Sequence, residues 1–301
     1  MGIDTREGFI SFHGYKIWYQ IVGSCDDGSK LPLLCLHGGP GVPHDYLEPI
    51  GEIAKSGRSV IFYDQLGCGN SDQPHDPKLW TIPLFVAEVD AVRAALGLDT
   101  VHLLGQSWGG MLAQEYMFTL PKGIASLTLA STLSSARQWS DEADRLRADL
   151  PPDIEAALRR HEAAGSTDSA EYQAHMEVYY DRHVCRVVPQ PECARRAFDK
   201  LARNPEVYHT MWGPSEFSPT GTIRDWDVTS RLAEITVPTL ITSGRFDEAT
   251  PAIAETLQQG IAGSEWVVFE ASAHLAHVEE PNRYNMVLDA FLTRVEAERG
   301  V

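Results

Sequence analysis

The 301-residue sequence has few cysteines, no long hydrophobic run and a deficit of basic residues. Its five cysteines are odd in number and form no C-x-x-C pair, so we expect neither a disulfide framework nor a zinc site. They are Cys25, Cys35, Cys68, Cys185 and Cys193. No stretch approaches the ~18 apolar residues of a membrane span, and the N-terminus lacks the apolar core of a signal peptide. These absences predict a soluble protein of the reducing cytoplasm.

The charge is strongly one-sided, with 25 Lys and Arg against 42 Asp and Glu and a net charge of −17. Such a field repels phosphate backbones and anionic lipid surfaces, so we expect no nucleic-acid partner and no membrane partner. The apolar share of 43% and the charged share of 22% are those of an ordinary globular protein. The length suggests one domain with an insertion.

Short apolar or β-branched runs recur along the chain, with segments of helical periodicity between them. This alternation predicts an α/β fold with a mostly parallel central sheet and flanking helices. The runs lie at Leu31–Leu36, Ser59–Tyr63, Val101–Leu104, Ile124–Ala130, Thr239–Ser243 and Trp266–Phe269. Near the N-terminus, Phe9–Phe12 and Lys16–Val22 flank His13-Gly14 and predict an antiparallel hairpin at the sheet edge.

The composition changes after the fourth run and changes back before the fifth. In between, the chain is rich in Arg, Glu, Asp and helix formers, and Pro and Gly residues divide it into four or five helical pieces. We interpret this stretch as a helical cap inserted into the core. The predicted division is residues 1–134 for the first part of the core, 135–225 for the cap and 226–301 for the second part of the core.

The strongest chemical signal is the G-x-S-x-G motif at Gly105–Gly109. It follows an apolar run and precedes the helix-prone stretch 111–119, which is the strand, tight turn and helix that a nucleophile elbow requires. The glycines allow the backbone to approach its neighbours closely, and the turn exposes the hydroxyl of Ser107. The sequence therefore predicts Ser107 as a nucleophile.

A second glycine-rich segment, His37-Gly38-Gly39-Pro40-Gly41, follows the first predicted parallel strand. Its glycines let backbone amides turn toward an oxyanion, and we assign that role to the amides of Gly39 and Trp108. His37 is expected to be a structural residue of this loop.

The acid and the base follow in the chain order Ser, Asp, His that this fold uses. Asp247 comes directly after the fifth run, at the carboxyl edge of the sheet where sites of α/β folds collect. His274 comes after the next run and is preferred as the base over His277. Asp225 and Asp227 are rival acids, but neither follows a strand.

Several motifs together carry a family resemblance: H-G-G-P-G at 37–41, D-Q-L-G-C-G-N-S at 64–71, G-Q-S-W-G-G at 105–110, and the segments around Asp247 and His274. The chain resembles the proline iminopeptidase family of α/β hydrolases over nearly its whole length. The resemblance implies a serine hydrolase that cleaves the amide bond after an unblocked N-terminal amino acid, through an acyl-enzyme. It implies no metal and no organic cofactor.

Within that family, the sequence at 213–217 and Glu248 resemble the branch of L-proline amide hydrolases and tricorn-interacting aminopeptidases. The resemblance implies that Glu216 and Glu248 hold the free ammonium group of a small-molecule or short-peptide substrate. Two positions depart from the family: many relatives carry arginine in place of Leu66, and serine or another small residue in place of Cys68. The resemblance therefore leaves the shape of the pocket and the preferred side chain open. The aromatic residues available to line a pocket for a proline ring are Tyr46, Trp139, Tyr179, Tyr180 and Trp212.

Other functions use the same residues differently. A small-molecule esterase or lactonase keeps the triad and leaves Glu216 and Glu248 unused, and an acyltransferase passes the acyl group to a nucleophile other than water. Epoxide or halide displacement needs a carboxylate nucleophile, which the serine at position 107 excludes. A ligand receptor on this scaffold does not need an intact set of Ser, Asp and His. The sequence leaves both peptides and simple amides open as substrates.

Overall fold

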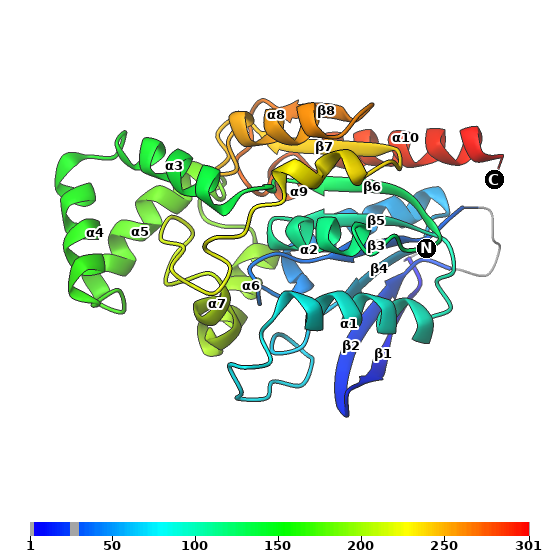
Figure 1. Ribbon diagram of the computed structural model, residues 1–301, viewed down its shortest axis with the longest axis horizontal. Coiled ribbons are helices and arrows are strands. Elements are labelled where there is room, and N and C mark those ends of the chain that lie inside the picture. Colours follow the sequence, from blue (N-terminus) through cyan, green and yellow to red (C-terminus); the bar gives the residue numbers. More distant parts are fainter. Residues whose placement is uncertain (1–2, 25–29, 301) are drawn as a thin grey trace.

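A computed structural model describes residues 3–24 and 30–300, so Cys25 lies outside the described residues. Within them, one sheet has the strand order β1-β2-β4-β3-β5-β6-β7-β8 (Figure 1). Its strands are β1 (Thr5–Phe12), β2 (Tyr15–Val22), β3 (Leu33–Leu36), β4 (Val60–Tyr63), β5 (Val101–Gln106), β6 (Ile124–Ala130), β7 (Thr239–Gly244) and β8 (Glu265–Phe269). Each predicted strand is therefore present, and the α/β-hydrolase fold class is confirmed.

The sheet is parallel except at its N-terminal edge, where β1 pairs antiparallel with β2 and β2 with β4. The central strands β3 to β7 are buried along their whole length. A parallel sheet covered on both faces requires this, and it explains why these strands are continuous apolar runs in the sequence.

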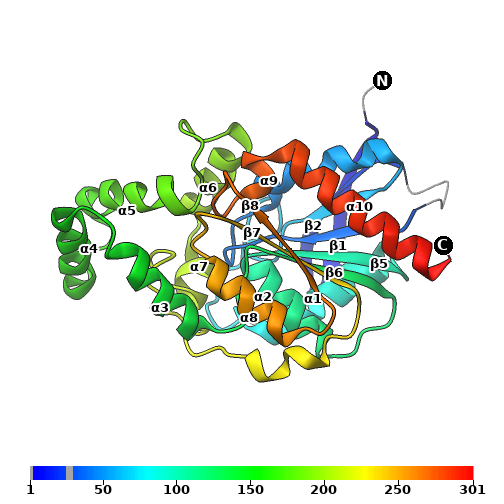
Figure 2. The same cartoon turned by 90° about the horizontal axis from the view of Figure 1, so that it is seen from above.

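Side chains of β3 show how the two layers are built. Leu34 and Leu36 pack in one core cluster, whereas Leu33 and Cys35 pack in the other, as the alternation of a strand demands. The first face is covered by α1 (Ile82–Ala95), α2 (Trp108–Met117) and α8 (Pro251–Gly260), and the second by η1 (His44–Ser56) and α10 (Pro281–Arg299). Figure 2 shows α10 on the opposite side of the sheet from α1, α2 and α8.

The insertion between β6 and β7 is helical, as predicted. It contains α3 (Ala136–Arg147), α4 (Pro152–Ala164), α5 (Ala170–His183), α6 (Glu192–Arg203) and α7 (Glu206–Met211), and η2 (Thr229–Glu234) leads back to β7. These helices extend beyond the sheet at the end opposite the chain termini (Figure 1). A β-bridge between Ser135 and Asp227 joins the two ends of the insertion.

Partly buried ion pairs stabilise the cap and join it to the core. Arg147 is buried, pairs with Glu155 and Glu162, and lies 4.7 Å from the ring of Phe217. Lys200 of α6 binds Asp45 of η1 at 2.8 Å. The cap is therefore packed against the core over the carboxyl end of the sheet. No helix in the described part of the chain is long and apolar enough to cross a membrane.

Candidate active site

Ser107 lies at the tight turn between β5 and α2. Its φ of 56° and ψ of −123° are strained for a residue with a side chain, and such strain persists only where the surroundings impose it. The amide of Ser107 donates to the carbonyl of Ala130 at 2.9 Å, and the hydroxyl of Thr132 donates to the carbonyl of Ser107 at 2.7 Å. A Cβ at Gly109 would overlap the carbonyl of Leu36. The elbow therefore forms as the motif predicts.

Asp247 and His274 are brought together from the ends of β7 and β8. The Nδ1–H of His274 donates to Oδ1 of Asp247 at 2.8 Å, and the amides of Ala249 and Gly244 donate to the same carboxylate at 2.8 and 3.2 Å. Since Asp247 accepts all three bonds, it fixes the tautomer of His274 and leaves Nε2 free to accept a proton. Burial alone would lower the pKa of His274, but the charge and hydrogen bond of Asp247, with Glu216, raise it.

A cavity of about 20 Å³ lies at the centre of these elements. It is lined by Ser107 and His274, by Gly39, and by Glu216 and Glu248. The predicted nucleophile, the predicted base, the loop proposed for the oxyanion and both glutamates thus surround one small cavity. Asp247 lies behind His274. That arrangement supports the predicted roles, which remain proposals.

The two amides proposed for the oxyanion come from different elements. Gly39 has a φ of 106°, and a Cβ there would come within 2.6 Å of two backbone nitrogens, so only glycine fits. Trp108 is the first residue of α2, where an amide has no partner within its helix. The indole of Trp108 points elsewhere and donates to Oε1 of Gln65 at 2.9 Å. Of the groups of Trp108, the backbone amide is therefore available to the site and the indole N–H is not.

Tyr46 and Gln106 connect the site loops, and the sequence did not predict this role for them. The hydroxyl of Tyr46 accepts from the amide of Gly38 at 2.6 Å and donates to Oε1 of Gln106 at 2.7 Å. The amide nitrogen of Gln106 donates to the carbonyl of His274 at 3.3 Å. These bonds tie together three loops that are far apart in the chain. The position of Gln106 inside the elbow motif was the available signal.

The remaining histidines near the site are structural, and so is Cys68. His37 accepts from the amide of Gln65 at 2.9 Å, and burial lowers its pKa to about 4. His277 donates to the carbonyl of Tyr46 at 3.1 Å, and burial lowers its pKa to about 3. Burial raises the pKa of Cys68, whose thiol donates to the carbonyl of Gln65 at 3.2 Å. These groups hold the loops and do not line the small cavity.

Glu216 reaches the cavity from the cap. Its carboxylate accepts from the hydroxyl of Tyr208 at 2.7 Å, and its amide donates to the hydroxyl of Tyr180 at 3.3 Å. The indoles of Trp139 and Trp212 donate to its carbonyl at 2.8 and 3.2 Å. Burial raises the pKa of the carboxyl, although the charge of His274 and the bond from Tyr208 oppose this. Three of the aromatic residues expected to line a pocket thus position Glu216.

Glu248 is only 1% exposed, and within the described residues neither of its carboxyl oxygens has a hydrogen-bond partner. Its Oε1 lies 3.8 Å from Nε2 of His274. Burial, together with the nearby charges of Glu216 and Asp247, raises the pKa of Glu248. A buried acid without a partner is costly, so its presence beside the site indicates a function that needs it.

Other acidic groups are engaged elsewhere. Asp225 is largely exposed and pairs with Arg224, and Asp227 accepts from the amide of Thr229, so neither reaches His274. Among the described residues, one cluster has ligand atoms close enough for a metal: His44, Asp45 and Glu48. Arg196 binds both of its acidic members, so a protein cation already neutralises them.

Residues 32–281 match the alpha/beta hydrolase fold family. The chain is 44% identical over 291 residues to a proline iminopeptidase of Clostridium botulinum, covering 96% of this chain and 98% of that protein. It superposes on the crystal structure of a proline iminopeptidase of Mycobacterium smegmatis with a TM-score of 0.90 at 40% identity, covering 98% and 100% of the two chains. The crystal structure of VinJ gives a TM-score of 0.94 at 41% identity, covering 96% and 99%.

Proposed function

The chain belongs to the proline iminopeptidase family of α/β hydrolases, and from this we propose that it is a serine aminopeptidase or amino-acid amidase that removes an unblocked N-terminal residue. The observation that carries the proposal is the Glu248 carboxyl, which is buried in the cavity that Ser107 and His274 also line and has no hydrogen-bond partner among the described residues. An ester or amide without a free amine offers this carboxyl no cationic group to bind. A substrate with a free N-terminus offers it an ammonium group.

In the proposed reaction Ser107 attacks the carbonyl carbon next to the carbon that bears the free amine, while Nε2 of His274 takes its proton. The amides of Gly39 and Trp108 stabilise the oxyanion, and each such donor is worth roughly 10²–10³ in rate. His274 then protonates the leaving amine, so that the C–N bond breaks and an acyl-enzyme remains. A water, deprotonated by His274, releases the free amino acid.

Glu216 and Glu248 hold the substrate amine on the acyl side of the scissile bond. Two carboxylates in a space from which water is largely excluded bind a cation strongly, and the ammonium in turn favours their ionised forms. Because Glu216 comes from the cap and Glu248 from the core, the amine binds where the two parts meet. Proline is the proposed N-terminal residue, because two relatives that are 44% identical over nearly the whole chain are proline iminopeptidases.

An esterase or lactonase, or an acyltransferase, would use the same triad. Neither accounts for the buried Glu248 and the partly buried Glu216 beside the nucleophile. Relatives at 40–44% identity over nearly the full chain include several proline iminopeptidases. A cytoplasmic location is also part of the proposal. It is supported by Cys35, Cys68, Cys185 and Cys193, which are unpaired in the described part of the chain.

The test is the release of a chromophoric amine from L-prolyl and L-alanyl arylamides, compared with their N-acetylated forms and with a simple acyl ester. We expect cleavage of the free-amine arylamides, little cleavage of the acetylated forms, and loss of activity in Ser107→Ala. Equal rates on free and acetylated amides would refute amine recognition. Turnover of the ester alone would favour the esterase.

A further inference from the structure

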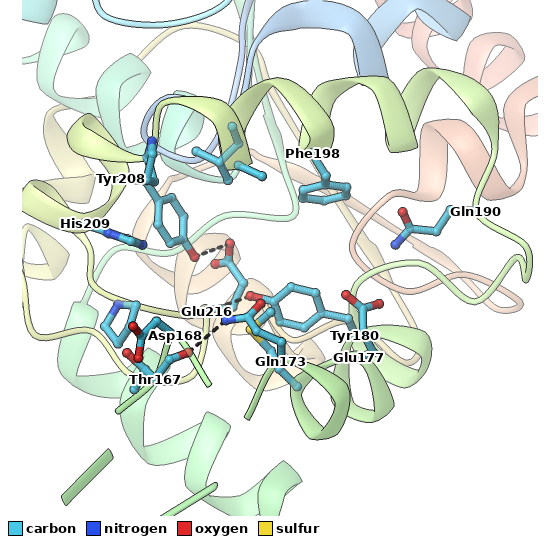
Figure 3. A pocket seen from close by; sticks show the side chains of 15 residues that line it. Thr167, Asp168, Gln173, Glu177, Tyr180, Gln190, Phe198, Tyr208, His209 and Glu216 are labelled. Carbon is cyan, nitrogen blue, oxygen red and sulfur yellow. Dashed lines mark hydrogen bonds between the residues drawn. The ribbon is translucent and has the colours of Figure 1, made fainter. Parts of the chain in front are cut away.

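A second, larger cavity of about 430 Å³ lies inside the cap, between α5, α6 and α7 (Figure 3). Its inner wall is apolar and aromatic, formed by Met176, Tyr180, Phe198, Leu201 and Tyr208. Its outer rim is polar and reaches solvent. The proposed reaction has so far given this cavity no role.

The larger cavity adjoins the catalytic one. Phe198 and Glu216 line both spaces, so they form the boundary between them. Figure 3 shows Glu216 between Tyr208 and Tyr180, with its carboxylate bonded to the first and its amide to the second. A molecule that reaches from Ser107 past Glu216 therefore enters the larger cavity.

The sizes of the two cavities indicate which part of a substrate each one binds. The amine on the acyl side binds Glu216 and Glu248, which line the smaller cavity beside Ser107. The group beyond the scissile bond needs a path to solvent, and the 430 Å³ cavity supplies both the space and the opening. Its apolar inner wall favours a large apolar group, since burial of such a surface is favourable.

The charge of the rim restricts that group further. Asp168 and Glu177 line the cavity at exposed positions, and none of the residues that line it is Lys or Arg. Neither acid forms an ion pair with another described residue. A free carboxylate at the far end of the leaving group would therefore meet like charge and no cation, whereas an amide or a cationic end would not.

We propose that this cavity binds the leaving group, and that the preferred substrates are amides of a bulky apolar amine that carries no free carboxylate. This inference rests on the proposed function, because it assumes that Glu216 and Glu248 hold the substrate amine. It adds the chemistry of the leaving group, which is an apolar amine or amino-acid residue. The carboxyl end of that residue is amidated or extended by further residues and is not a free acid.

The experiment compares kcat/KM for Pro-Gly-NH2 and Pro-Phe-NH2, whose leaving amines are chemically alike and differ in size. We expect the phenylalanine substrate to be favoured on the order of tenfold, the factor that burial of one aromatic side chain supplies. Ala202→Trp, which fills the cavity from an exposed position on α6, removes most of this preference because it slows Pro-Phe-NH2 more than Pro-Gly-NH2. Gln173→Trp on the opposite wall has the same effect.

Ala163→Trp is the matched control, since Ala163 is an exposed cap residue that does not line the cavity. It leaves both rates unchanged. For the charge, Pro-Phe-Gly-NH2 is cleaved faster than Pro-Phe-Gly, and salt narrows the difference.

The outcomes separate the two proposals. Equal rates on the glycine and phenylalanine substrates, unaffected by Ala202→Trp, overturn the inference and leave the aminopeptidase intact. A change in preference between N-terminal residues in Ala202→Trp shows that the cavity holds the acyl side, which also overturns it. Cleavage of esters alone, with neither amide turned over, refutes the proposed function itself.

Discussion

Replacing Glu248 by glutamine separates recognition of the amine from stability of the fold. The side chain is buried, lacks a hydrogen-bond partner among the described residues, and lies beside Glu216 and His274. Glutamine keeps its size and removes its charge. Because Glu248 is only 1% exposed, little of the carboxylate's interaction with a cation is screened.

Removal of one partner from a buried ion pair, here the pair of Glu248 with the substrate ammonium group, costs about 3–5 kcal/mol. Glu248→Gln should therefore lower kcat/KM for a free-amine prolyl arylamide by about 10²- to 10³-fold. The triad is retained, so an uncharged fluorophosphonate should label Ser107 in the variant within a few-fold of the native rate. That labelling rate is the control for intact catalytic groups.

The same substitution should stabilise the free protein as the pH rises. Since burial raises the pKa of Glu248, the folded protein keeps a proton that the unfolded chain releases. Native stability then falls with rising pH between the unfolded and folded pKa values, by about 1.4 kcal/mol for each pH unit. Glutamine has no proton to lose. We expect little stability difference near pH 5 and a more stable variant near pH 8.

Urea unfolding at the two pH values, beside the kinetic assay, completes the test. If the arylamide rate and the labelling rate fall equally, Glu248 acts on the triad and does not bind the amine. If the variant is no more stable at pH 8 than at pH 5, relative to the native protein, the buried carboxyl is not retained in its protonated form. Either result would refute the reasoning.

Two further predictions concern the elbow and the base. Gly109→Ala should destabilise the protein by about 3 kcal/mol or more in urea unfolding, because its Cβ would overlap the carbonyl of Leu36; Gly97→Ala has free space and should cost only the ~1 kcal/mol of its φ of 66°. Fluorophosphonate labelling should decline as the pH falls through the pKa of His274, which burial lowers but Asp247 and Glu216 raise above the ordinary histidine value. Glu216→Gln should move that decline to lower pH, and an unmoved profile would contradict the coupling.

Features encoded in short segments were predictable from the sequence. The elbow at Ser107 and the strand ends before Asp247 and His274 depend on glycines and apolar runs within a few residues. The hairpin was predicted from its two runs, but the start of β1 was predicted too late. The strand begins at Thr5, and its first half could not be recognised because it is exposed and shows no apolar alternation.

Contacts between distant segments were not predictable. The hydroxyl of Tyr46 joins Gly38 to Gln106, and Arg58 pairs with Glu296 across 238 residues at 2.6 Å. Such pairs leave no local pattern, because each partner is an ordinary polar residue in its own segment. The larger cap cavity was missed for the same reason, since helices from separate parts of the insertion form its walls.

The bridge between Ser135 and Asp227 has an evolutionary consequence. Because the two ends of the insertion meet, recombination in a duplicated gene can replace the whole cap insertion by another without moving Ser107, Asp247 or His274. Such an exchange would replace Glu216 and keep Glu248, so one of the two residues of the proposed amine site belongs to the exchanged segment. New substrates can therefore be acquired by recombination at two adjacent joints, while the bond-breaking chemistry is inherited unchanged.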